Sequence, residues 1–337
     1  MSNLPFNSKL GINFSNTFQK HKIGNKTAAE DMQNDGIAAA KLFNYTQTKF
    51  LDAALKQGIQ VIPDVPNSDL QKLAEDTQAK GIAKTIAAAL SPYKSILAAV
   101  MIGNEPLIAQ PTVYGPLLKA ALENLQRALS NAKLSVKLSV PFNSGIEAAS
   151  YPPSMGSFKD ELAPYLREVC GFLKKTDSFF TINNYPYYAR IGNPSDVPLD
   201  YCLFTKNQPQ FTDPNTQKKY YNIFDAMYDA AYFALKSIGF AELPIIVGET
   251  GWPTAGGLDA NPENAQTFNQ NLIAHVNSGK GSPYLPSASL TTFIFEMYDE
   301  DLKSRAPGPF ETHWGWYKHS GTGDEYSKKY SLDWSSS

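Results

Sequence analysis

Eight apolar runs recur along the chain, and each is followed by turn residues and then by a segment with helical periodicity. They lie at residues 11–14, 38–43, 59–65, 96–102, 136–142, 179–185, 243–247 and 291–298. Most are nearly continuously apolar, a pattern that is typical of parallel strands covered on both faces. We therefore predict a β-strand in each run.

Between these runs, apolar residues repeat at helical spacing, most clearly at 117–129, 224–238 and 264–277. Gly239 and Gly279 follow the last two segments and are expected to end those helices. Strand–helix alternation repeated eight times predicts an α/β protein with a single (β/α)8 TIM barrel, formed as one domain by residues 1–337. The rival is a doubly wound sheet, but its typical glycine-rich first loop is missing.

Two polar stretches stand outside the alternation. Residues 194–219 are rich in Pro, Asn and Gln and are expected to form a long loop after a strand. The tail from about residue 321 is expected to lie loosely on the barrel.

Charge and hydropathy exclude several classes of partner. The formal net charge of the 337 residues is -2, and no Lys/Arg stripe is present, so nucleic acid and anionic membranes are poor candidate partners. No run of 18 apolar residues exists that could span a membrane. Residues 1–7 lack the features of a signal peptide, so either the protein is intracellular or a signal has been removed.

Cysteines and histidines give no sign of a metal site. Cys170 and Cys202 lie far apart, and we expect two buried thiols, with one disulfide as the alternative. The four histidines form no metal-binding motif, and no phosphate- or dinucleotide-binding motif is present. We predict that the protein uses neither a metal nor a cofactor.

Two glutamates carry the candidate chemistry. Glu105 lies in the segment 103–106 and Glu249 in the segment 248–253, and each segment directly follows an apolar run. In a parallel barrel, the carboxyl ends of the strands converge on one face. Each glutamate alone could be a solvated loop residue, but one carboxylic acid and one carboxylate are what glycoside hydrolysis needs.

Seven segments, in order along nearly the whole chain, resemble glycoside hydrolase family 17, the plant-type endo-β-1,3-glucanases and their fungal and bacterial relatives. They are residues 65–70, 102–105, 151–158, 183–187, 222–226, 248–253 and 295–303. The resemblance implies a retaining mechanism, with Glu105 as the general acid/base and Glu249 as the nucleophile. It further implies carboxyl groups about 5–5.5 Å apart and a pKa of Glu105 raised by the charge of Glu249 and by partial burial.

The resemblance also implies supporting roles for uncharged residues. Asn104 would hydrogen-bond the 2-hydroxyl of the sugar. Tyr185 would orient Glu249 through its hydroxyl, and Asn183 would support the same site. Trp252 is expected to form the floor of the -1 subsite, with a place in the core as the alternative.

Charged positions matched by the resemblance are Glu300, Lys303 and Glu311, which would surround the acid, tune its pKa and bind sugar hydroxyls. The alternative is a solvated run of charges. The chain departs from the family pattern at Phe43, where tyrosine is common, and at Glu296, where a small residue is common.

The function implied is cleavage of internal β-1,3-glucosidic bonds in laminarin-like or cell-wall β-1,3-glucans by a secreted or surface-acting monomer. A β-1,3-glucanosyltransferase with the same two glutamates is the first alternative. A non-catalytic glucan-binding barrel is a second, although both carboxylates are retained here. A β-1,4-glycanase or mannanase would share the Asn-Glu pair, but the segments 152–158 and 249–253 argue against it.

Overall fold

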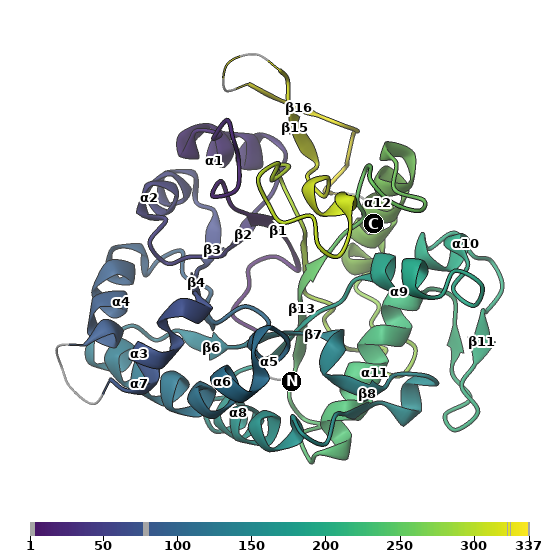
Figure 1. Cartoon of the computed structure of the whole chain (residues 1–337), viewed down its shortest axis with the longest axis horizontal. Helices are drawn as coiled ribbons and strands as arrows, with labels where there is room; N and C mark the ends of the chain where they lie inside the picture. Colours follow the sequence, from purple (N-terminus) through teal and green to yellow (C-terminus); the bar gives the residue numbers. More distant parts are fainter. Residues whose placement is uncertain (1–3, 77–80, 322, 324, 336–337) are drawn as a thin grey trace. The chain divides into compact units, whose positions relative to one another are not determined.

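A computed structural model describes residues 4–76, 81–321, 323 and 325–335 (Figure 1). The chain forms two compact units. Unit 1 consists of Lys41–Asn183 and Ala230–Ile246 with the segment before Ser8, and unit 2 consists of Ser8–Ala40, Asn184–Asp229 and the chain from Val247 onward.

The strands of unit 1 form parallel groups and one antiparallel pair. β4 pairs with β5 and β5 with β6, both in parallel, and β7 pairs in parallel with β10. β8 and β9 form the antiparallel pair. The bounds are β3 (Gln60–Ile62), β4 (Asp64–Val65), β5 (Ala99–Ile102), β6 (Lys137–Ser139), β7 (Pro141–Asn143), β8 (Glu147–Ala149), β9 (Ser157–Phe158) and β10 (Phe180–Asn183).

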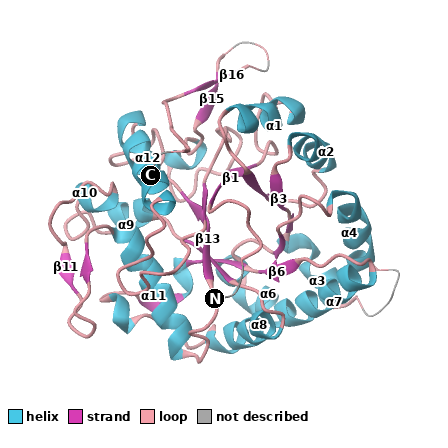
Figure 2. Cartoon of the chain, turned by 180° about the vertical axis from the view of Figure 1, so that it is seen from behind, coloured by secondary structure: helices cyan, strands magenta, loops and turns pink. Residues whose placement is uncertain are grey.

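Helices cover these strands, and the central one is α7, which packs against α3, α4 and α8 and contacts β5 (Figures 1 and 2). The predicted stripe of α7 is buried, including Leu118, Leu122, Leu125 and Leu129. The helices are α2 (Thr48–Gln57), α3 (Leu70–Ala74), α4 (Ile82–Leu90), α5 (Pro106–Ala109), α6 (Pro111–Tyr114), α7 (Leu118–Asn131) and α8 (Ala163–Lys175), and the short 3₁₀ turns are η1 (Asn67–Asp69), η2 (Ser91–Tyr93), η3 (Gly115–Leu117), η4 (Ser144–Ile146) and η5 (Pro153–Met155).

In unit 2, β14 pairs in parallel with both β1 and β13, and β11–β12 and β15–β16 are antiparallel hairpins. α12 packs against β1. The elements are β1 (Leu10–Phe14), α1 (Asn25–Asn34), α9 (Pro186–Gly192), α10 (Leu199–Cys202), β11 (Phe211–Thr212), β12 (Lys219–Tyr220), α12 (Pro262–Asn277), β14 (Thr292–Ile294), η6 (Pro309–Thr312), β15 (Tyr317–His319) and β16 (Tyr326–Lys328). Residues of both units occur in β2 (Ala39–Leu42), α11 (Ile223–Ser237) and β13 (Ile245–Thr250).

The predicted elements are confirmed one by one. Each of the eight apolar runs contains a strand, and two of the runs are split, into β3 and β4 and into β6 and β7. The three predicted helices are α7, α11 and α12. Gly239 and Gly279 follow α11 and α12 and have φ values of 90° and 72°, a left-handed conformation that glycine adopts without strain.

The two polar stretches are more ordered than the sequence suggested. The segment 194–219 carries α10 and most of the β11–β12 hairpin. In the tail, Trp334 is buried and its ring lies tilted against that of Trp316 with centroids 6.0 Å apart, and the Gln270 side chain forms hydrogen bonds with the backbone of Asp333. The expectation of a loose tail is therefore wrong for its described residues, because aromatic side chains anchor it to unit 2.

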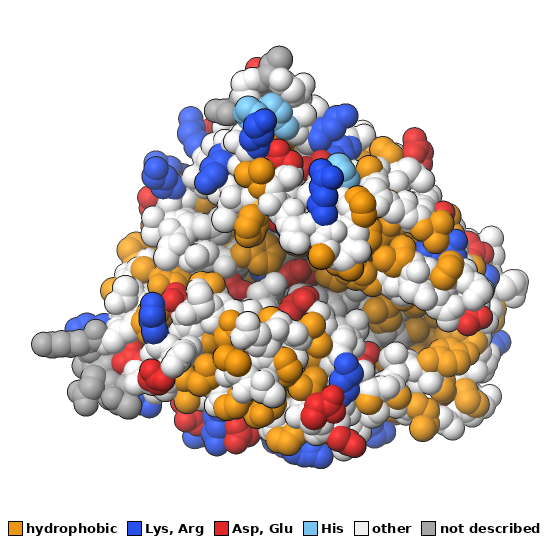
Figure 3. Space-filling model, viewed as in Figure 1, with side chains coloured by type: hydrophobic (Ala, Val, Ile, Leu, Met, Phe, Trp, Pro, Cys, Tyr) orange, Lys and Arg blue, Asp and Glu red, His pale blue; other side chains and the backbone are white. Residues whose placement is uncertain are grey.

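Other expectations concern thiols, membranes and charge. Cys170 and Cys202 are both buried free thiols, as predicted. No helix among the described residues is long and apolar enough to cross a membrane. On the face shown in Figure 3, Lys and Arg side chains are most frequent around α1 and the β15–β16 hairpin, with a few Asp and Glu among them.

Candidate active site

The backbone at Glu105 is held in an unusual conformation in unit 1. β5 ends at Ile102, and Gly103 and Glu105 follow with φ values of 73° and 50°, in the left-handed region. The Asn67 side chain pairs with the Asn104 backbone in both directions: its Nδ2 donates to the Asn104 carbonyl at 2.8 Å, and its Oδ1 accepts the Asn104 N–H at 2.9 Å. A Cβ at position 103 would lie 2.6 Å from Asn67 Oδ1, so this approach requires glycine.

The carboxyl group of Glu105 is held by two amides. Asn143 donates from Nδ2 to Oε2 at 2.7 Å, and Asn183 donates from Nδ2 to Oε1 at 2.8 Å. The two asparagines are register partners at the ends of β7 and β10. The structure thus places Asn183 on Glu105, whereas the resemblance implied only that Asn183 would support the same site as Tyr185.

Glu249 lies on β13 in unit 2 and is 5% exposed. The Tyr185 hydroxyl donates to its Oε2 at 2.9 Å, which is the contact expected of that tyrosine. The Asn184 N–H donates to the Glu249 carbonyl at 2.8 Å, so the backbone before Tyr185 is tied to the backbone of the glutamate. These bonds fix both the position and the orientation of one carboxyl oxygen.

A charged cluster of unit 2 surrounds Lys303. Its Nζ lies 3.2 Å from Glu311 Oε2 and 4.5 Å from the centroid of the Phe295 ring. The Tyr188 hydroxyl donates a hydrogen bond to the same Glu311 side chain. Burial acts to lower the pKa of Lys303, but the surrounding carboxylates, Glu249 among them, outweigh it and raise that pKa. Lys303 is therefore a fixed positive charge in the field of Glu249.

Two more carboxyl groups belong to this cluster. Burial raises the pKa of Glu300, and the nearby Lys303 only partly offsets the effect. Glu296 is 1% exposed, and its protonated carboxyl group can donate a hydrogen bond to the carboxyl group of Glu300. Burial, with the charge of Glu300, raises the pKa of Glu296 well above its ordinary value. Glu296 therefore keeps its proton under conditions in which exposed glutamates are ionised.

Trp252 is not where the subsite prediction put it. Its side chain is fully buried, its Nε1 donates to the Asp259 carbonyl at 2.9 Å, and its ring lies edge-on to Tyr187 with centroids 5.0 Å apart. A sugar ring cannot stack on a face that neighbouring aromatic residues cover. The core alternative is correct, and the expected floor of the -1 subsite is wrong.

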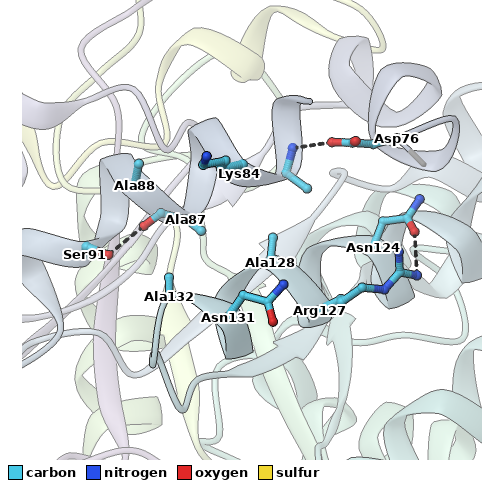
Figure 4. A pocket seen from close by; sticks show the side chains of 11 residues that line it. Asp76, Lys84, Ala87, Ala88, Ser91, Asn124, Arg127, Ala128, Asn131 and Ala132 are labelled. Carbon is cyan, nitrogen blue, oxygen red and sulfur yellow. Dashed lines mark hydrogen bonds between the residues drawn. The ribbon is translucent and has the colours of Figure 1, made fainter. Parts of the chain in front are cut away.

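A separate hollow of about 590 Å³ lies between α4 and α7 (Figure 4). Lys84 and Arg127 are among its lining side chains, and Asp76 at its edge accepts the N–H of Ala83. None of the predicted site residues lines it. Among the described residues, no group of three or more His, Cys, Asp or Glu could hold a metal ion.

Within unit 1 the structure groups Asn104, Glu105 and Asn183, and within unit 2 it groups Glu249 with Tyr185 and Lys303. Sequence reasoning gave no role to three residues that hold, in turn, the Asn104 backbone, the Glu105 carboxyl group and the Glu311 side chain. They are Asn67, Asn143 and Tyr188. Asn143 directly follows the apolar run 136–142, so the rule that selected both glutamates would also have found it.

One parallel strand carries Glu249 and another leads into Glu105, and amide or phenol donors hold each carboxyl group; this is the arrangement of an α/β protein of the glycosidase type. The chain belongs to the glycosyl hydrolases family 17, whose model matches residues 13–334.

Named relatives agree with that membership. The chain is 36% identical over 301 residues to glucan endo-1,3-beta-glucosidase 4 of Arabidopsis thaliana, covering 86% of this chain and 58% of the relative. It is 35% identical to the tobacco (Nicotiana tabacum) glucan endo-1,3-beta-glucosidase, acidic isoform GL153, covering 84% and 79%. The chain spans 58% to 65% of the length of the first three curated relatives.

Solved structures show the fold. The structure matches CJP38, a beta-1,3-glucanase and allergen of Cryptomeria japonica pollen, with a TM-score of 0.87 and 32% identity, covering 97% of this chain and 99% of that one. A structure from a study of two plant beta-glucan endohydrolases with distinct substrate specificities matches with a TM-score of 0.84 and 29% identity, covering 96% and 99%. The predicted (β/α)8 fold class is confirmed by these neighbours.

Proposed function

We propose that this chain hydrolyses internal β-1,3-glucosidic bonds of β-1,3-glucans with retention of configuration, using Glu105 as general acid/base and Glu249 as nucleophile. Named relatives that are glucan endo-1,3-beta-glucosidases support the substrate class. The observation that carries the residue assignment is that both glutamates follow or end a parallel strand and that donors fix the carboxyl group of each.

The reaction proceeds in two balanced steps. A carboxylate oxygen of Glu249 forms a bond to the anomeric carbon while the glycosidic bond breaks, and the departing sugar oxygen takes the proton of Glu105. Water then attacks the anomeric carbon, its proton passes to Glu105, and the bond to Glu249 breaks. Both glutamates return to their starting states.

The residues around the two glutamates support these two steps. Asn104 binds the 2-hydroxyl of the sugar, and Tyr185 keeps one oxygen of Glu249 in a hydrogen bond so that the other faces the anomeric carbon. Lys303 places a positive charge near Glu249, whose negative charge contributes to the raised pKa of Lys303. Glu311 and Glu300 in turn hold Lys303 in place.

Product analysis on laminari-oligosaccharides tests the proposal. Wild type should yield shorter oligosaccharides whose new reducing ends are first in the β configuration, as followed by NMR. Glu249→Ala should be inactive and Glu105→Gln should lose at least about 100-fold, the contribution of one general acid. Glu263→Gln, on the exposed side of α12, is the matched control and should retain wild-type activity.

Other outcomes discriminate between the alternatives. Products longer than the substrate would identify a glucanosyltransferase, in which a sugar hydroxyl replaces water in the second step. Binding without cleavage by wild type would identify a glucan-binding barrel. Activity retained by Glu249→Ala would contradict the assignment of the nucleophile.

We also propose that the protein acts as a monomer, secreted or at the cell surface, where it meets cell-wall glucan. Size-exclusion chromatography with light scattering tests the first point. Fractionation of the source cells, with glucan-degrading activity assayed in the medium, the wall and the lysate, tests the second.

A further inference from the structure

Two asparagines hold Glu105 from adjacent strands, but they differ in what they can do. Asn143 ends β7 and Asn183 ends β10, and each gives one amide N–H to its own oxygen of the carboxyl group. The donor–acceptor distances are 2.7 Å to Oε2 and 2.8 Å to Oε1. The difference lies in the carbonyl ends of the two amides.

The Asn143 amide has one possible orientation. Its Oδ1 accepts the N–H of Gly145 at 2.8 Å, and the orientation of an asparagine amide follows from such a network. A Cβ at position 145 would itself lie 2.8 Å from this Oδ1, so glycine allows the close approach. Because the carbonyl oxygen of Asn143 already accepts this hydrogen bond, its NH₂ group must face Glu105. Oε2 therefore accepts a hydrogen bond whether or not Glu105 carries a proton.

The orientation of the Asn183 amide is not determined in this way. Its side chain is fully buried, and its Oδ1 has no hydrogen-bond partner among the described residues. A buried acceptor without a donor is unfavourable. If the amide turned over, Oδ1 would face Glu105 Oε1, and a proton on Oε1 would satisfy it. Asn183 can thus donate to the carboxylate and accept from the acid.

We propose that Glu105 releases and regains its proton through Oε1, with Asn143 as a fixed donor to Oε2 and Asn183 as the amide that turns over. In the first step the proton leaves Oε1 for the departing sugar oxygen, and the Asn183 amide returns to donate to Oε1. In the second step a proton of the attacking water returns to Oε1. Both asparagines are positioning residues, and the inference rests on the proposed function of Glu105.

The pH dependence of kcat/KM tests the asymmetry. Asn143→Ala removes a donor that binds the carboxylate more strongly than the neutral acid, so the alkaline limb of the pH profile should move upward by about one pH unit, the difference expected for one charge-assisted hydrogen bond. Asn183→Ala removes both a donor to the carboxylate and an acceptor for the acid. The alkaline limb of its pH profile should therefore stay near that of wild type, while its maximal kcat/KM falls about tenfold. Equal shifts in both variants, or a shift in Asn183→Ala alone, would overturn the inference.

A second measurement separates proton transfer from a general loss of structure. The leaving group of 2,4-dinitrophenyl β-laminaribioside needs no proton, so on this substrate kcat/KM of both variants should stay within about threefold of wild type. On laminari-oligosaccharides, kcat/KM of both variants should fall by about tenfold or more. Equal losses on the two substrates would indicate a merely structural role. Asn124→Ala is the matched control, because it removes the hydrogen bonds that the Asn124 amide donates to the Leu73 and Ala74 carbonyls of unit 1. Its rates on both substrates should equal those of wild type.

Glu105→Gln keeps failure of this inference distinct from failure of the proposed function. If that variant hydrolyses laminari-oligosaccharides as wild type does, Glu105 is not the acid and the proposed function fails. If it is inactive while the two asparagine variants behave alike, only the asymmetric proton transfer is wrong.

Discussion

Replacing Asn67 by alanine should misplace Glu105 through the backbone of Asn104, the preceding residue. The Asn67 side chain supplies both partners of the Asn104 backbone, at 2.8 and 2.9 Å. The next residue, Glu105, has a φ of 50°, a conformation that non-glycine residues keep only where their surroundings impose it. Without the Asn67 side chain, the Asn104 N–H and carbonyl lose their partners and the left-handed turn loses its support.

The size of the effect follows from the two bonds. A buried polar group that loses its partner costs about 1–3 kcal/mol, and Asn104 is half-buried, so water recovers part of the loss. We expect Asn67→Ala to lower the free energy of unfolding by about 2–3 kcal/mol. Because about 1.4 kcal/mol corresponds to a factor of ten, a comparable loss in positioning should lower kcat/KM by about 10- to 100-fold.

Urea unfolding and steady-state kinetics on laminari-oligosaccharides measure both quantities. Gly103→Ala is a second route to the same defect, because its φ is 73° and its Cβ would lie 2.6 Å from Asn67 Oδ1. Both variants should therefore lose stability and kcat together. The reasoning is refuted if Asn67→Ala unfolds within about 0.5 kcal/mol of wild type, the range of a neutral surface change, or retains wild-type kcat/KM.

Three further predictions concern unit 2. Because the pKa of Glu296 is raised on folding, the folded state binds its proton more tightly and wild type loses stability as pH rises above about 4.3, the pKa of an unperturbed glutamate. Glu296→Gln should thus gain stability relative to wild type between pH 4 and pH 7 in thermal unfolding, and an equal difference at both pH values would contradict this. Tyr185→Phe removes the hydroxyl that holds Glu249 and should lower kcat by about 10- to 100-fold while KM and the unfolding temperature change little; a change in KM alone would argue against orientation of the nucleophile. Gly251→Ala places a Cβ 2.1 Å from the Phe295 carbonyl oxygen and should destabilise the protein by at least about 2 kcal/mol in urea unfolding, so wild-type stability would show that this approach is not tight.

Strand and helix positions were predictable because their signal is local. An apolar run such as 243–247 is stable only when it is buried, and the buried strand β13 begins within it. The spacing of leucines at 117–129 likewise selected α7. The polar tail was misjudged because Trp334 packs on Trp316, a contact that no local pattern encodes.

Both glutamates could be selected from the sequence because they directly follow apolar runs, but most of their partners could not. Asn67 precedes the Asn104 backbone it supports by 37 residues, and Asn143 and Asn183 reach Glu105 across 38 and 78 residues. Trp252 was misassigned because an indole near a catalytic residue and an indole in the core look alike in a sequence.

The sequence by itself determined where strands and helices form, which glutamates lie just beyond apolar runs, and the family to which the chain belongs, because each depends on residues close together in the chain or on motifs in fixed order. Tertiary structure alone decided which amides hold the Glu105 carboxyl group, that Trp252 is buried, and that Glu296 lies where its pKa is raised. Hydrogen bonds and burial depend on atoms a few ångströms apart, and only the folded chain brings residues as distant as Glu105 and Asn183 to that distance.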